Sequence, residues 1–270
     1  MQLTDSFYKQ KFIIVYPNQF GYHTDSYKYC EYLNDRYDIS YICFDQGFEK
    51  LELPHINVIY IQFNTGKIRR LIELFLEVFK NCNKNPDNIL FVIQFKFSFL
   101  LGLFAKSKKK ILDYRTGDLS INPLKRWLKN RWMSMDSLSY DKITVISDGV
   151  CKNIFLLNRK RIIILPLGAD VISSKKHEYK QIRLLYVGAI HTRNVYQTIE
   201  GLAEFISMNK NLRSSINYTI IGFGPQHIIT HLLETIKEKQ VEDIVKYVGR
   251  VKYPDLTPYF DQCNVGISYI

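Results

Sequence analysis

The sequence predicts an α/β protein made of two halves, each with a parallel sheet. Short apolar runs rich in β-branched residues alternate with longer amphipathic segments, the pattern of strands buried on both faces and of their connecting helices. A polar segment without periodicity, residues 171–181, interrupts this alternation, which then begins again. We therefore expect an N-terminal domain over residues 1–170, a linker over 171–181 and a second, partial domain over 182–270.

The first half begins with FIIVY at residues 12–16, an apolar run that predicts a buried strand and ends in the turn-prone PNQFG. Further apolar runs predict the later strands, and amphipathic periodicity between them predicts the helices. The expected strands span residues 12–16, 39–44, 58–63, 89–93, 110–113, 143–146 and 162–165, and the expected helices span residues 24–36, 68–81, 122–138 and 149–157. Because strands and helices alternate, the sheet is expected to be parallel with helices on both faces.

The second half repeats this rhythm from RLLYV, residues 183–187, a strand that ends at a glycine. Strands are expected at residues 183–187, 218–221, 245–248 and 265–270, and helices at 195–209, 226–239 and 255–262. Both halves are thus Rossmann-like, but the second stops on its fourth strand, before the βα units that usually complete such a domain. We expect the second domain to be incomplete.

Composition and cysteine usage indicate a globular protein of a reducing compartment. The chain is 46% hydrophobic and 23% charged, and its five cysteines are scattered without a C-x-x-C pair. The N-terminus lacks the apolar stretch of a signal peptide, and the most apolar window, residues 89–105, is interrupted by Gln94 and Lys96. We therefore expect a cytoplasmic protein.

The net charge of +11 predicts attraction to an anionic partner. Nucleic acid, an anionic membrane surface and phosphorylated small molecules all fit, so the charge alone does not choose among them. No nucleic-acid-binding motif occurs, and the aromatic residues lie mostly in apolar runs instead of on basic platforms. We therefore expect no nucleic acid partner.

Glycines follow successive strands of the second half, where ligands of parallel sheets bind. They are Gly188, Gly222, Gly224 and Gly249. Glycine lets a ligand approach the backbone closely, although glycine is also common in ordinary tight βα turns. The repetition at several strand ends favours a binding site.

The residues after Gly188 strengthen this expectation. His191, Thr192 and Arg193 lead into the start of a helix, where free N–H groups and the helix dipole attract anions. Arg193 would add a charged fork. The pattern predicts a phosphate-binding loop.

Four segments, read in order, resemble those of family 4 glycosyltransferases, which have the GT-B fold of two Rossmann-like domains facing each other. They are ITVISDGVCKNIF (143–155), IIILPLGAD (162–170), LLYVGAIHTRNVYQTIEGL (184–202), and YTIIGFGPQ (218–226) together with the final VKYVGRVKYPDLTPYFDQCNVGISYI. Near the start, FGYHTDSYKYCEYL lies where the family has its acceptor-side loop and first helix. The resemblance spans essentially the whole chain.

The resemblance implies a donor site in the second domain. Gly188 matches the glycine that opens the loop around the donor diphosphate, and Arg193 stands for the family's lysine, whereas Ala189 replaces an arginine. Gly222 and Gly224 match the "GxGP" turn. Gly249 and Arg250 match the loop beside the nucleotide base. The family's paired glutamates, E-x7-E, have no counterpart in this sequence.

The resemblance implies a glycosyltransferase of hexosyltransferase type that moves a sugar from a UDP- or GDP-sugar to a saccharide or lipid-linked saccharide. The implied setting is the synthesis of a cell-surface polysaccharide, with retention of configuration. The nucleotide sugar is a substrate, so no cofactor is expected, and because no D-x-D motif occurs we expect no metal. Two alternatives stay open: an inactive GT-B-like fragment or partner subunit that binds nucleotide or protein without turnover, and a sugar-nucleotide epimerase.

On the acceptor side, the candidate catalytic residues are His23, Asp113 and Arg115, and Gly21 is a candidate binding residue. Asp113 and Arg115 follow a strand directly, where polar groups meet substrate, but an ion pair that caps the strand end fits equally well. His23 either binds the acceptor or is a surface histidine near a turn.

The segment 122–138 mixes cations with both tryptophans of the chain, Trp127 and Trp132. Such helices lie on anionic membranes, which would suit a peripheral enzyme at the inner membrane face. The sequence favours a simpler interpretation, a helix packed with Leu124, Trp127, Leu128 and Met135 toward the core and its lysines toward water.

Overall fold

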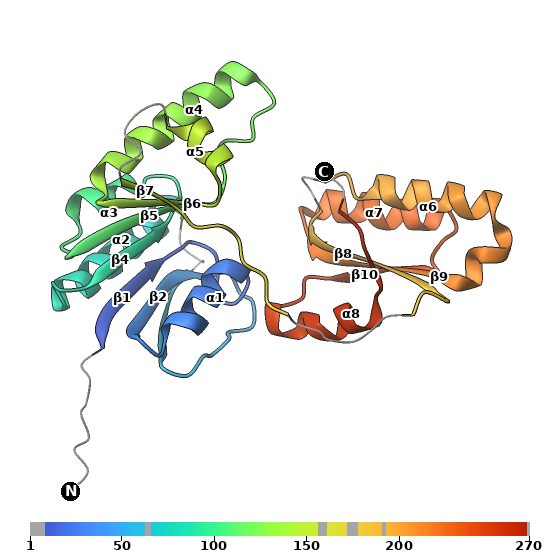
Figure 1. The fold of residues 1–270 in the computed structure, drawn as a ribbon, viewed down its shortest axis with the longest axis horizontal. Coiled ribbons are helices and arrows are strands. Elements are labelled where there is room, and N and C mark those ends of the chain that lie inside the picture. The colour runs from blue at the N-terminus through green and yellow to red at the C-terminus, as the bar shows by residue number, and fades with distance from the viewer. Residues whose placement is uncertain (1–8, 63–65, 156–160, 172–177, 191–192, 269–270) are drawn as a thin grey trace, which may run out of the picture. The chain divides into compact units, whose positions relative to one another are not determined.

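The computed structural model describes residues 9–62, 66–155, 161–171, 178–190 and 193–268. It divides into two compact units, Met1–Gly168 and Ala169–Ile270, each with its own hydrophobic cluster. Both units combine a parallel sheet with helices, which confirms the expected α/β class. Each unit is shown in Figure 1.

Unit 1 contains a seven-stranded parallel sheet in the order β3-β2-β1-β4-β5-β6-β7. Its strands are β1 (Gln10–Val15), β2 (Tyr37–Asp45), β3 (Ile56–Gln62), β4 (Ile89–Ile93), β5 (Lys109–Tyr114), β6 (Lys142–Val145) and β7 (Ile162–Ile164). Its helices are α1 (Thr24–Leu33), α2 (Lys67–Lys84), α3 (Phe99–Phe104), α4 (Pro123–Asp136), η1 (Ser137–Ser139) and α5 (Asp148–Ile154). The chain order reverses between β1 and β4, and at such a switch point an open sheet leaves a crevice for ligand.

The helices of unit 1 cover both faces of its sheet. Right-handed crossovers place α1 on one face and α2 to α5 on the other, because the strand order runs in opposite directions from β1. The larger cluster joins alternate residues of the central strands to α2, α3 and α5, through side chains such as Leu74, Val78 and Leu101. This cluster fixes the sheet whose carboxyl edge bears the candidate residues.

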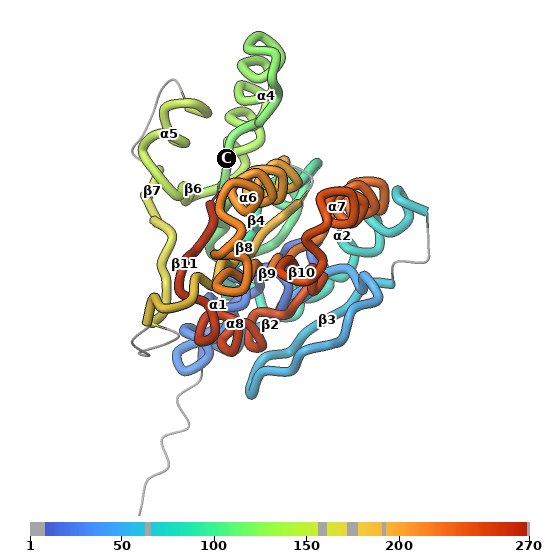
Figure 2. The backbone as a smooth tube through the Cα atoms, turned by 90° about the vertical axis from the view of Figure 1, so that its right-hand side faces the viewer, coloured from blue at the N-terminus to red at the C-terminus, as the bar shows by residue number. Residues whose placement is uncertain are grey.

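Unit 2 contains a four-stranded parallel sheet in the order β10-β9-β8-β11. Its elements are β8 (Ile182–Ala189), α6 (Tyr196–Met208), η3 (Lys210–Ser215), β9 (Ile216–Phe223), α7 (Gln226–Glu238), β10 (Val245–Gly249), η4 (Tyr253–Leu256), α8 (Thr257–Gln262) and β11 (Val265–Gly266). In Figure 2 the helices α6 and α7 are drawn in orange and red-orange, and α8 in red. Right-handed crossovers put α6 and α7 on one face and α8 on the other, so the sheet is covered on both sides.

Two features differ from the sequence-based expectations. The helix α3 was not expected, because its residues continue the apolar run of β4. The last strand pairs with β8 only over Val265 and Gly266, and residues 269–270 of the expected strand lie outside the described part of the chain. The part of the predicted linker at 172–177 also lies outside it.

The expected packing of α4 is wrong. Leu124, Trp127, Leu128 and Met135 are 50–66% exposed, and the residues that α4 buries are the polar Asn130 and Asp136. The helix is therefore apolar on the outside. Its contacts with unit 1 include the Met133 side chain, which packs against the core cluster, and the hydrogen bond from the Tyr114 hydroxyl to the Met133 carbonyl.

All five cysteines are reduced; Cys30, Cys43, Cys82 and Cys151 are buried in unit 1, and Cys263 of unit 2 is half-buried. None of the helices in the described part of the chain combines the length and the apolar character needed to cross a membrane.

Candidate functional site

In unit 1, a buried carboxylate stands at the end of β5. Asp113 is fully buried, and its Oδ1 accepts a hydrogen bond of 2.5 Å from the Thr144 hydroxyl on the neighbouring strand β6. The guanidinium of Arg115 lies 3.4 Å from its Oδ2. Burial raises the pKa of Asp113, and the Thr144 hydrogen bond and the Arg115 charge oppose that rise. The carboxylate therefore depends on Arg115 for its charge balance.

Arg115 joins this strand end to helix α1. Its Nη2 lies 2.5 Å from Asp25 Oδ2, and its guanidinium stacks over the Tyr29 ring at 5.3 Å. Its Nη1 is buried and has no hydrogen-bond partner in the part of the chain that the structure describes. Burying an unpaired N–H of a cation is costly, so this atom is suited to bind a substrate oxygen.

His23 begins helix α1 beside this ion pair. Its Nδ1 accepts a hydrogen bond from the Ser26 backbone N–H, and its ring contacts the Tyr16 ring edge-on at 4.8 Å. Burial lowers the pKa of His23, and the Arg115 charge contributes to the fall, against the opposite effect of Asp25. The His23 side chain is therefore half-buried, and it caps the N-terminus of helix α1.

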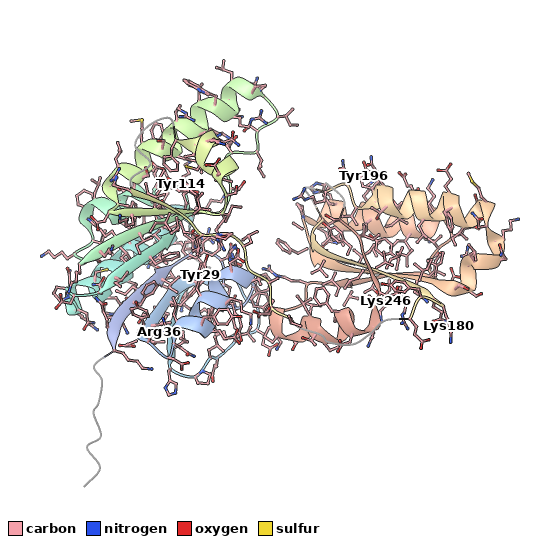
Figure 3. The ribbon with its side chains drawn as sticks, viewed as in Figure 1. Tyr29, Arg36, Tyr114, Lys180, Tyr196 and Lys246 are labelled. Carbon is pink, nitrogen blue, oxygen red and sulfur yellow. The ribbon has the colours of Figure 1, made fainter. Side chains whose placement is uncertain are left out.

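Gly21 lies in the loop between β1 and α1, as the sequence predicts, and packs against Leu51. The structure therefore brings His23, Asp113 and Arg115 together with Asp25 at the carboxyl edge of the first sheet. In Figure 3, the label of Tyr29 marks the α1 side of this cluster.

In unit 2, the ends of β8 and β9 meet at two glycines. Gly188 and Gly222 are partners in the parallel register, and a Cβ on Gly222 would stand 2.0 Å from the Gly188 carbonyl oxygen. Only glycine fits such a close approach. The side chains of Tyr186 and Ile190 pack against these two glycines, and Gly222 is buried, so the glycines bring β8 and β9 close together at the edge where a ligand would meet the sheet.

The next strand ends in a similar way. Gly249 has φ +91°, a backbone conformation that favours glycine, and Arg250 follows it. The Arg250 guanidinium stacks over the ring of Phe223 at 4.4 Å, and the Tyr247 hydroxyl donates to the Gly222 carbonyl at 3.1 Å. The ends of β9 and β10 thus present a cation on an aromatic ring beside the glycines.

Two helices begin at the same edge. Neither α6, which starts at Tyr196 (labelled in Figure 3), nor α7, which starts at Gln226, has a side-chain hydrogen bond at its N-cap. Backbone carbonyls accept from the N–H groups of Gln197 and Thr198 in α6 and of Ile228 in α7, and the positive end of each helix dipole lies at this edge. Gly224 lies between β9 and α7, and Arg193 is exposed just before α6. The candidates His191 and Thr192 lie outside the described residues.

Sequence reasoning missed several members of both clusters. Asp25, Tyr29 and Thr144 belong to elements distant in sequence from Asp113, and only the folded sheet shows that they meet it. Phe223 is the last residue of β9, so its place at a strand end was a usable signal. Among the described residues no group of three or more His, Cys, Asp or Glu side chains could hold a metal ion.

Comparison with solved structures identifies the fold. The chain is similar to Anabaena HepE in complex with UDP and glucose (TM-score 0.68, 13% identity), covering 95% of this chain and 73% of that chain. It is also similar to sucrose-phosphate synthase from Thermosynechococcus elongatus (TM-score 0.66, 13% identity; 96% and 75% covered) and to a glycosyltransferase from Rickettsia africae (TM-score 0.63, 12% identity; 97% and 73% covered).

These neighbours are glycosyltransferases of the GT-B class, and the chain has their fold. No family model matches the sequence, and no curated protein matches it.

Proposed function

We propose that the chain is a glycosyltransferase that transfers a hexose from a UDP- or GDP-sugar to a saccharide or lipid-linked saccharide. The observation that carries the proposal is the carboxyl edge of the unit 2 sheet, where β8 and β9 meet at Gly188 and Gly222 and the helices α6 and α7 begin. Two cations lie at this edge: Arg193 is exposed just before α6, and Arg250 stacks over Phe223. The fold shared with HepE, which was solved with UDP and glucose, supports a nucleotide-sugar donor.

The donor is proposed to bind by its diphosphate. The positive dipole ends of α6 and α7 attract the phosphate oxygens, and Arg193 adds a charged fork. Arg250 and Phe223 lie at the neighbouring strand ends, where a base would find an aromatic ring and a cation. These cationic groups and helix starts stabilise the departing diphosphate, so the proposed reaction uses no metal ion.

The unit 1 cluster is proposed to serve the acceptor. The buried Nη1 of Arg115 is suited to bind an acceptor oxygen, and Asp113 and Asp25 hold the guanidinium in place. His23, with its pKa lowered by burial, is neutral at pH 7 and can exchange a proton with a hydroxyl. Following the motif resemblance, we propose retention of configuration, a role in cell-surface polysaccharide synthesis and a cytoplasmic location.

The test is thermal unfolding of the chain with UDP, GDP, ADP, CMP and their sugars. A nucleotide at about a hundredfold excess over its Kd should stabilise the folded state by about 2.7 kcal/mol. We expect UDP or GDP alone to do so. Arg193→Ala should weaken that binding about tenfold or more, because it removes a charge-assisted contact.

Lys210→Ala is the matched control, since Lys210 is exposed in η3, before β9, at the opposite edge of the sheet. No shift with any nucleotide would contradict the proposed donor site. A shift without transfer of labelled sugar to any acceptor would instead support a binding subunit without turnover. Conversion of the donor sugar without an acceptor would support an epimerase.

A further inference from the structure

Helix α4 carries an apolar stripe on its outer side. Leu124, Leu128, Trp132 and Met135 are spaced by four, four and three residues and therefore lie on one face of the helix. Their exposed fractions are 66%, 55%, 65% and 65%. Leu119 and Ile121, in the loop before α4, are 76% and 97% exposed. Soluble monomers rarely leave so continuous an apolar surface in water.

The side of α4 that faces unit 1 carries the buried Asn130 and Asp136 and the partly buried Met133. Asn130 accepts a hydrogen bond of 2.8 Å from the Asp118 backbone, which ties the helix to the loop before it. Asp136 is 8% exposed, and burial raises its pKa to about 6. The helix is thus fixed to unit 1 in the orientation that turns its apolar stripe outward. A simple rotation about its axis would break these contacts.

Cations border the stripe. Helix α4 contains Lys125, Arg126, Lys129 and Arg131 against one acidic residue, Asp136. Lys125 is exposed at the edge of the stripe, Lys129 pairs with Asp118, and Arg131 lies 5.9 Å from the Trp127 ring. Arg126 is exposed too, but its helical position is opposite the stripe. Basic side chains beside an apolar stripe that contains tryptophan are the features of helices that lie in the interface of an anionic membrane.

The apolar surface continues from α4 onto α3. A groove with a volume of about 410 Å³ is lined by Phe99 and Leu103 of α3 and by Trp132 and Met135 of α4. Phe104 at the end of α3 is 66% exposed. Figures 1 and 2 show α4 (green) extending beyond the strands of the unit 1 sheet, so a flat surface can reach it.

We infer that α4 and the loop before it dock unit 1 on a lipid bilayer that carries anionic headgroups. The leucines, methionine and tryptophans enter the boundary between headgroups and acyl chains, and Lys125, at the edge of the stripe, contacts the headgroups. The charge pattern favours this occupant over a second copy of the chain, because that copy would bring the same cations to the interface. The inference is independent of the donor and of catalysis.

The two tryptophans of the chain are Trp127 and Trp132, so intrinsic tryptophan fluorescence reports on α4 alone. We expect a blue shift when the whole chain meets vesicles of phosphatidylcholine with phosphatidylglycerol, and quenching when the lipids carry bromine on their acyl chains. Vesicles of phosphatidylcholine alone should give neither. Equal responses with both compositions, or no response with either, would overturn the inference.

Two variants sharpen the test by vesicle flotation. Leu124→Gln with Leu128→Gln removes apolar contacts while keeping good helix formers, and Lys125→Glu reverses the charge at the edge of the stripe. Each should lower the partition coefficient on anionic vesicles about tenfold, as each basic residue near such a surface contributes roughly 1 kcal/mol. The controls are Met208→Gln, 72% exposed on α6, and Lys237→Glu on α7, both in unit 2.

Circular dichroism and thermal unfolding should show that the variants fold like the unchanged chain. Undiminished flotation of both α4 variants would contradict the inference. Sedimentation without lipid gives the other decisive result: a dimer that Leu124→Gln with Leu128→Gln dissociates would assign this face to a second copy and overturn docking on lipid.

Discussion

Arg115 balances two carboxylates that lie on different elements. Asp113 is fully buried at the end of β5, and Asp25 reaches the same guanidinium from the first turn of α1. When one partner of a buried ion pair is removed, the other charge stays buried with nothing to compensate its desolvation. The resulting loss of folding free energy is larger than the stabilisation that the intact pair provides. The stability of unit 1 should therefore depend strongly on this one cation.

Arg115→Met should lower the free energy of unfolding by about 3 kcal/mol at pH 7. Burial already raises the pKa of Asp113 above its value in the unfolded chain. Between these two pKa values the folded chain binds more protons than the unfolded chain, so the free energy of unfolding falls as the pH rises through this range. Without the cation the pKa of Asp113 rises further, so the loss should be smaller at pH 4 than at pH 7. Urea unfolding at both pH values measures this.

Arg126→Met is the matched control, because Arg126 is exposed on α4. It should change the unfolding free energy little at either pH. An Arg115→Met chain as stable as the unchanged one at pH 7 would mean that Asp113 and Asp25 do not need this partner.

At this scale the sequence singled out Asp113 and Arg115 as candidates, because they stand at the end of an expected strand. It left open whether they form an ion pair or a site, and the structure shows that Arg115 pairs with Asp25 as well as with Asp113. The role of Asp25 could not be predicted, since the contact joins α1 to β5 across β4, and the sequence does not show which strands become neighbours.

At the scale of elements, the strands of both sheets were predictable because strands buried on both faces are short, continuous apolar runs. The orientation of α4 was not. Apolar residues at helical spacing define a face, but they do not say whether protein or another surface covers it. The sequence-based prediction assumed that the protein core covers the apolar face of α4. In the structure, the residues that α4 buries are Asn130 and Asp136.

The β8–β9 edge allows a paired test with one chemical change. Gly222→Ala should lower the free energy of unfolding by about 2 kcal/mol, because its Cβ would stand 2.0 Å from a backbone oxygen that cannot move aside easily. Gly201→Ala, in the exposed middle of α6 with nothing within 4 Å, should raise it by roughly 0.5–1 kcal/mol.

Denaturant unfolding of both variants measures the difference in their free energies of unfolding. The thermal stabilisation by UDP or GDP should shrink or disappear for Gly222→Ala and stay unchanged for Gly201→Ala. Equal stability of the two variants would show that the close approach of the strands relaxes at little cost.

At the scale of the whole molecule, two sheets with separate hydrophobic clusters make up the chain. From the interrupted alternation of strands and helices, the sequence predicts two domains joined by a linker over residues 171–181, and that linker stays a prediction. Chains with separate cores often depart from a single cooperative transition. We therefore expect the two units to lose their structure at different denaturant concentrations.

The unequal distribution of the reduced cysteines lets chemical labelling follow each unit separately. Four buried thiols lie in unit 1 and the half-buried Cys263 lies in unit 2. Burial raises the pKa of Cys43 to about 12 and that of Cys30 as well, so both react slowly with alkylating reagents while unit 1 is folded. The chain is alkylated briefly at increasing urea concentrations, and intact mass spectrometry counts the alkyl groups on each molecule. If unit 2 unfolds at the lower urea concentration, molecules with one alkyl group should appear before molecules with five. If unit 1 unfolds first, molecules with four alkyl groups should appear before molecules with five. The number of alkyl groups on each molecule therefore records which sheet came apart first.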